Sequence, residues 1–69
     1  MKDRFNQNIE VGDIVIFSTI GEMAEGVVTK LGRYRKIMVK NSGGYIKSKL
    51  CNHVINKTKL EINASSLFI

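Results

Sequence analysis

The chain has 69 residues, enough for one small domain but too few for a deep catalytic pocket beside its core. Its residues are 43% hydrophobic and 25% charged, which is typical of a folded protein and excludes a disordered one. The net charge is +5, and the single cysteine and single histidine exclude an internal disulfide and a structural zinc site.

Residues 1–8 are expected to form a polar N-terminal arm. Their polarity argues against a secretion signal, and no run in the chain approaches the roughly 20 apolar residues of a membrane-spanning helix. A reducing compartment suits a chain whose only cysteine is Cys51. We therefore expect a cytoplasmic protein that does not bind a membrane.

Short apolar runs separated by glycines follow the arm. The chain has no proline and six glycines, and the runs between them are rich in Ile, Val and Phe. This spacing predicts an all-β fold, a small barrel or sandwich, over residues 9–59. We expect a first strand at 13–19, a loop at 21–26 and a second strand at 26–31. Because residues 14–17 are all apolar, the first strand should be covered on both faces or curl around the core.

The third strand, expected at 35–40, has two unlike faces. Its residues alternate, with one face formed by Ile37 and Val39 and the other by Lys36, Met38 and Lys40. This alternation predicts one buried face and one basic face exposed to solvent.

A turn and three further elements complete the predicted fold. Residues 41–44, Asn-Ser-Gly-Gly, are the strongest turn signal in the chain, because Asn and Gly tolerate the positive φ of tight turns. We expect a fourth strand at 45–49, a short helical turn near 50–52 and a fifth strand at 53–58.

Two alternatives stay open in the C-terminal third. Ile46, Leu50 and Val54 are spaced by four, so residues 46–58 could instead form a basic amphipathic helix. The β-branched residues and the preceding turn favour strands. Residues 60–69 form a tail that could add a strand, contact a second copy or stay flexible.

Four segments carry a resemblance to a known family. They are Val11-Gly12-Asp13-Ile14-Val15, Gly26-Val27-Val28-Thr29-Lys30-Leu31, Lys36-Ile37-Met38-Val39 and His53-Val54-Ile55. Over residues 9–58 the chain resembles the KOW-type SH3-like barrels, which implies a five-stranded barrel that associates with nucleic acid, a polymerase or the ribosome. The loop at 22–25 is acidic and apolar where KOW proteins are rich in Gly and Lys, so the basic strands after it are expected to contact nucleic acid instead.

Particular positions in these segments have physical roles. Gly12 lets the chain turn into the first strand, and Gly26 permits a close approach or a bulge between the first two strands. Six apolar residues are expected to close the barrel, namely Val15, Phe17, Val28, Ile37, Val39 and Val54.

The charges are divided sharply along the chain. Residues 1–29 contain two basic and five acidic residues, whereas residues 30–59 contain nine basic residues and no acidic one. Such a division indicates a polyanionic partner, and nucleic acid is the first candidate. A solvated lysine-rich surface is the alternative. The nine basic residues are Lys30, Arg33, Arg35, Lys36, Lys40, Lys47, Lys49, Lys57 and Lys59.

The segment at 32–36, Gly-Arg-Tyr-Arg-Lys, is the first candidate for contact with nucleic acid. Arg33, Arg35 and Lys36 can neutralise phosphates, which releases counterions, and the ring of Tyr34 can stack on an unpaired base. The alternative is an exposed hairpin tip whose tyrosine packs along an arginine stem.

A basic ribbon on the third and fourth strands is the second candidate. The turn at 41–44 is expected to place Lys47 and Lys49 beside Lys36 and Lys40, with Tyr45 as a second stacking platform. The alternative is that these lysines protect an exposed strand edge from aggregation.

No catalytic or metal site is predicted. Cys51 is expected to be a small core residue, and His53 has no evident catalytic partner. Glu22 and Glu25 alone would make a weak metal site. We therefore expect neither an enzyme nor a cofactor.

Three hypotheses follow. The first is a nucleic-acid-binding module, for DNA or RNA, that contacts the phosphate backbone and serves transcription or translation as an accessory protein. The second is a protein-interaction module, of a kind suited to a phage, that docks on a host machine such as RNA polymerase or the ribosome through residues 22–25 or 67–69. The third is self-association, in which the acidic part of one copy meets the basic part of another.

Overall fold

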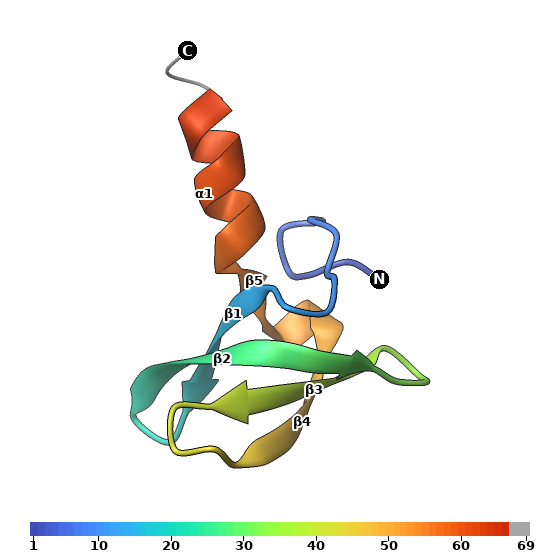
Figure 1. The fold of residues 1–69 in the computed structure, drawn as a ribbon, viewed down its shortest axis with the longest axis vertical. Coiled ribbons are helices and arrows are strands. Elements are labelled where there is room, and N and C mark those ends of the chain that lie inside the picture. Colours follow the sequence, from blue (N-terminus) through green and yellow to red (C-terminus); the bar gives the residue numbers. More distant parts are fainter. Residues whose placement is uncertain (67–69) are drawn as a thin grey trace.

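The computed structural model describes residues 1–66, and its main element is one five-stranded antiparallel sheet. The strands follow the order β4-β3-β2-β1-β5 across the sheet (Figure 1). A short 3-10 helix, η1, links β4 to β5, and an α-helix, α1, follows β5. The elements are β1 (Ile14–Thr19), β2 (Glu22–Leu31), β3 (Lys36–Asn41), β4 (Ile46–Leu50), η1 (Cys51–His53), β5 (Ile55–Asn56) and α1 (Lys57–Ser66). The prediction of a small, barrel-like all-β fold with five strands is confirmed.

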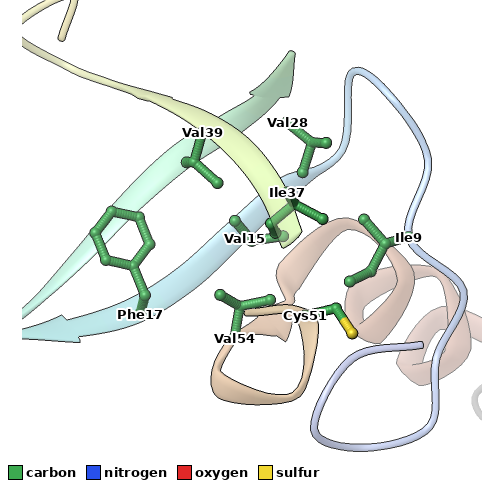
Figure 2. Close-up of a cluster of buried hydrophobic side chains, with 8 residues drawn as sticks. All are labelled: Ile9, Val15, Phe17, Val28, Ile37, Val39, Cys51 and Val54. Carbon is green, nitrogen blue, oxygen red and sulfur yellow. The ribbon is translucent and has the colours of Figure 1, made fainter. Parts of the chain in front are cut away.

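The core lies against one face of this sheet and contains all six residues expected to close it. Ile9 and Cys51 join them, so the expectation that Cys51 is a core residue is also confirmed. Figure 2 shows the side chains from β1, β2 and β3 converging on Val54, which follows η1. The buried cluster is Ile9, Val15, Phe17, Val28, Ile37, Val39, Cys51 and Val54.

The sheet curls around this core. The ammonium group of Lys49, on β4, lies 5.0 Å from the centre of the Phe17 ring on β1. Those two strands are separated by β2 and β3 in the sheet, so only a curled sheet brings them together. The four apolar residues of β1 fit this shape in part: Val15 and Phe17 are buried, whereas Ile16 is half-buried and Ile14 is 37% exposed. The second face of β1 is therefore only partly covered.

The connection between β1 and β2 differs from its prediction. Residues 21–26 are not a loop, because β2 begins at Glu22 and pairs with Thr19 at the end of β1. Only Ile20 and Gly21 make the turn, and Gly21 has the positive φ of 78° that such a short hairpin connection needs. The acidic and apolar residues at 22–25 therefore lie on a regular strand.

The C-terminal part also corrects two expectations. The fifth strand has two residues instead of six, and residues 57–66 form a helix where a strand end and a tail were predicted. Asn56 caps this helix, because its side-chain oxygen accepts the N–H of Lys59 at 3.1 Å. The alternative helix over 46–58 is wrong, since 46–50 is a strand. The expected contacts of 67–69 lie outside the described residues.

A buried polar network ties the N-terminal arm to the end of the sheet. Asn56 is fully buried, and its backbone N–H donates to Asp3 at 2.6 Å while its amide donates to Asp13 at 2.7 Å. Asp3 also accepts the backbone N–H groups of Phe5 and Gln7 and the side-chain amide of Gln7. Burial raises the pKa of the Asp3 carboxyl, but these hydrogen bonds together outweigh burial and hold that pKa below its usual value. Residues 1–8 are therefore anchored to β5.

Candidate nucleic-acid interface

Ion pairing divides the nine basic residues of the run into two groups. Lys57 pairs with Glu25 at 2.8 Å, and Lys59 lies 3.4 Å from Glu10 and 3.9 Å from Asp13. The hydrogen bond and the charge of Glu25 raise the pKa of Lys57. The other seven form no ion pair within residues 1–66, and they are Lys30, Arg33, Arg35, Lys36, Lys40, Lys47 and Lys49. These seven cations all lie between Lys30, near the end of β2, and Lys49, near the end of β4.

The strand register rules out the predicted ribbon of four lysines. In the antiparallel pairing of β3 with β4, Lys47 is opposite Val39 and Lys49 is opposite Ile37. Residues that face each other across two strands share a face of the sheet, so Lys47 and Lys49 are on the core side. Lys36 and Lys40 project from the other side, as expected, opposite Leu50 and Ile46. A register different by one residue would have joined the four lysines on one face.

Two lysines can occupy the core side of β4 because that strand is the edge of the sheet. The core ends beneath it, and an inward lysine at an edge can extend its charged group past the apolar cluster into water. Lys49 does so across the Phe17 ring, where the cation faces the aromatic ring. Lys47 is exposed.

The outer face of the sheet mixes lysines with aliphatic side chains. One row crosses four strands, from Ile14 to Val27, Lys40 and Ile46. Its three apolar members are 37%, 42% and 56% exposed, in that order. Beside Lys40 the surface has a hollow of about 200 Å³. This face therefore offers apolar contact area as well as charge.

The turn between β2 and β3 concentrates cations and an exposed aromatic ring. We name residues Arg33, Tyr34, Arg35 and Lys36 the basic turn. The N–H of Lys36 donates to the carbonyl of Arg33 at 3.1 Å, which closes the turn. Tyr34 is 86% exposed, and Lys30 stands close by near the end of β2, opposite Met38. The structure thus brings together the residues of the first predicted site.

The backbone of the basic turn is strained. Tyr34 has a φ of 58° and Arg35 a φ of 63°, values at which a Cβ crowds the following carbonyl. Two-residue turns of this kind are normally made by Asn and Gly. The Cys51 N–H donates to the Arg35 carbonyl at 2.7 Å and helps to hold the strained residue in place.

The remaining predicted site residues lie away from the basic turn. Lys40 and Tyr45 flank the turn that joins β3 to β4. Figure 1 shows this turn at the opposite end of β3 from the turn that joins β2 to β3. Tyr45 is 73% exposed, but its ring lies over Gly43 in its own turn. That turn is organised by Asn41, whose side-chain oxygen accepts the N–H groups of Gly43 and Tyr45, and the predicted turn at 41–44 is confirmed.

A cavity of about 350 Å³ adjoins the basic turn. It lies where the N-terminal arm meets η1, and Arg35 forms one wall. Lys2 and Asn52 were not predicted as site residues, because only the folded arm brings residues so distant along the chain together. The lining residues are Met1, Lys2, Asp3, Arg35, Cys51 and Asn52.

A protein-family model matches residues 1–60 of the chain. The chain belongs to the family described as Domain of unknown function (DUF7205). The matched part of this DUF7205 domain includes the arm, all five strands, the basic turn and the cavity. No curated protein matches the chain.

Two kinds of feature are absent from the part of the DUF7205 domain that the structure describes. Among residues 1–66, no helix is long and apolar enough to cross a membrane. Within the same residues, no three His, Cys, Asp or Glu side chains gather where they could hold a metal ion. His53 is exposed at the end of η1.

Proposed function

We propose that this DUF7205 domain is a non-enzymatic nucleic-acid-binding module that contacts the phosphate backbone. The observation that carries the proposal is a group of seven cations, between Lys30 and Lys49, that have no ion-pair partner within residues 1–66, whereas Lys57 and Lys59 are paired. Gathering like charges is unfavourable in the free protein, and phosphates would relieve that repulsion while releasing counterions.

The basic turn is the centre of the proposed interface. Arg33, Arg35 and Lys36 would hold phosphates together with Lys30, and Tyr34 would stack on a base. Lys40 and Tyr45 would reach only a longer ligand, and Lys47 and Lys49 would contact one that wraps around the β4 edge. The five antiparallel strands support the resemblance to KOW-type barrels, and the buried free thiol of Cys51 supports a cytoplasmic location.

The test measures binding of labelled DNA and RNA by fluorescence anisotropy at two salt concentrations. We expect affinity to fall as salt rises, with a slope of roughly 0.7–0.9 for each phosphate contacted. The Arg33→Ala/Lys36→Ala variant should bind about tenfold more weakly. The matched control, Lys57→Ala/Lys59→Ala, removes the same charge and should change affinity about twofold or less. No binding at low salt, or equal losses in the two variants, would refute the proposal.

A second candidate function is protein docking through the outer face. The exposed row formed by Ile14, Val27 and Ile46 favours it, because apolar side chains at the centre of a polar rim are common in protein interfaces. The partner would be a larger assembly such as RNA polymerase or the ribosome. A pull-down from nuclease-treated bacterial lysate separates the candidates, since a partner lost with nuclease argues against docking. The Val27→Asp variant should abolish capture of a partner that survives nuclease.

A further inference from the structure

The cavity beside the basic turn has walls that are fixed by backbone hydrogen bonds. On the arm side, the Ile9 N–H donates to the Met1 carbonyl at 2.9 Å, and Lys2 pairs with Asn8. On the other side, Cys51 is buried and its N–H donates to the carbonyl of Arg35. The cavity therefore exists in the free protein and does not need a ligand to shape it.

The chemistry of the lining suits a neutral, flat group with a phosphate at its mouth. Most of the surface is apolar, contributed in part by Met1 and Cys51, and Asn52 supplies an amide that both donates and accepts hydrogen bonds. Arg35 and Lys2 add positive charge. At about 350 Å³ the cavity is at the lower end of the range for small-molecule sites, so it would take one such group.

Asp3 favours a neutral group over an anion inside the cavity. Its carboxylate is held by four hydrogen bonds, from Phe5, Asn56 and two groups of Gln7. The lowered pKa keeps this carboxyl ionised at neutral pH. Because this fixed negative charge repels a phosphate, we expect phosphates to bind the cations at the rim, Arg35 and Lys2, and not to enter the cavity.

The strain in the basic turn is the second observation that points to a ligand. Two non-glycine residues with positive φ stand next to the cavity, and one of them, Arg35, lines it. Strain of this kind persists where it positions side chains for function. Here it presents Tyr34 to solvent and Arg35 to the cavity.

From these observations, and resting on the proposed function, we infer that the domain binds single-stranded nucleic acid and takes one unpaired base into this cavity. Tyr34 stacks on a neighbouring base. Arg35 and Lys2 hold the phosphates on either side of the nucleotide whose base is inserted. A duplex would have to unstack and unpair a base before it could do the same. The domain therefore distinguishes single strands from duplexes through the cavity, beyond what its charge provides.

The test compares three ligands whose strands are of equal length, about 12 nucleotides, so that the two single-stranded ligands carry the same number of phosphates and the duplex carries twice that number. They are a single-stranded thymidine oligomer, the same strand in a duplex, and an abasic oligomer that keeps the sugar-phosphate backbone without bases. We expect the thymidine oligomer to bind about tenfold more tightly than the abasic one, and more tightly than the duplex. Equal binding of the thymidine and abasic oligomers would overturn base insertion and leave phosphate binding intact. No binding of any ligand would overturn the proposed function as well.

A cavity variant localises the effect. Asn52 is exposed, so Asn52→Trp should fold and fill the mouth of the cavity. It should reduce the preference for the thymidine oligomer over the abasic one to about twofold or less. The matched control, Ser18→Trp, places the same ring at an exposed position near the far end of β1 and should leave the preference unchanged. A folded Asn52→Trp variant that retains the full preference would place the bases elsewhere.

Discussion

The strained basic turn leads to a prediction in which stability and binding change in opposite directions. The double variant Tyr34→Asn/Arg35→Gly replaces both residues with those that tolerate a φ near +60°. Each original residue stores on the order of 1–2 kcal/mol in this conformation. The variant should recover about 2–3 kcal/mol in all, less about 1 kcal/mol for the greater freedom of glycine in the unfolded chain.

The expected net gain in the free energy of unfolding is therefore about 1–2 kcal/mol. For a domain of this size, that corresponds to a rise in Tm of roughly 5–15 °C. Urea denaturation followed by circular dichroism measures the stability, and anisotropy with the thymidine oligomer measures binding. Binding should weaken at least about tenfold, because the variant loses both the stacking ring and the Arg35 cation.

A matched control separates strain from side-chain loss. Tyr34→Ala/Arg35→Ala removes the same side chains but keeps two Cβ atoms at positive φ, so it should weaken binding without gaining stability. If the Asn-Gly variant is no more stable than this alanine variant, the turn is not strained. If the Asn-Gly variant binds as well as the original chain, the turn is not the interface.

Two further predictions concern the fold. The folded-state pKa of Asp3 is below its unfolded value, so the unfolded state binds more protons in acid, and stability should fall as pH drops from about 4 through the folded pKa. Asp3→Asn should lower the free energy of unfolding by about 2–3 kcal/mol at pH 7 and should reduce the fall of this free energy in acid. If the variant loses as much stability in acid as the original chain, the role of the network is contradicted. Gly26→Ala should cost about 1–3 kcal/mol, because its Cβ would collide with the Val39 side chain and lie 3.0 Å from the Lys40 carbonyl oxygen. Gly43→Ala is the control, because a Cβ added there would lie 3.3 Å from its nearest atom, a ring carbon of the exposed Tyr45. Chemical denaturation should show a smaller loss in the free energy of unfolding for this variant.

The core could be predicted from the sequence because it depends on local alternation. In β3, Ile37 and Val39 are buried and Lys36 and Lys40 are exposed, as their spacing requires. Gly26 was expected to allow a close approach between the first two strands, but the close approach in the structure is to Val39 and Lys40 of β3.

The site was predicted less well because it depends on how strands meet. The basic turn is contiguous, so its residues were found together. The lysine ribbon needed the register between β3 and β4, and the sequence around 41–45 allows more than one register. The cavity could not be predicted, because it forms only when the arm folds back onto η1 and no local sequence pattern indicates that fold.

The helix α1 was missed although one signal was present. Asn56 precedes Lys57, Thr58 and Lys59, and Asn is a strong residue for a helix N-cap. The predicted strand extended too far along the chain because the residues before Asn56 are β-branched. The buried Asn56 decides the boundary, because its backbone and side chain serve β5, the arm and α1 at once.

The bond between Asp3 and Asn56 also has a consequence for the order in which the molecule assembles. It joins residues 53 positions apart, whereas the hairpins from β1 to β4 join near neighbours. Closing a long loop is entropically costly until its contacts form, so we expect the meander to assemble first and the arm and β5 last. The basic turn belongs to the early part, but the wall that completes the cavity belongs to the late part. A chain caught between these stages would attract phosphates without distinguishing a single strand from a duplex.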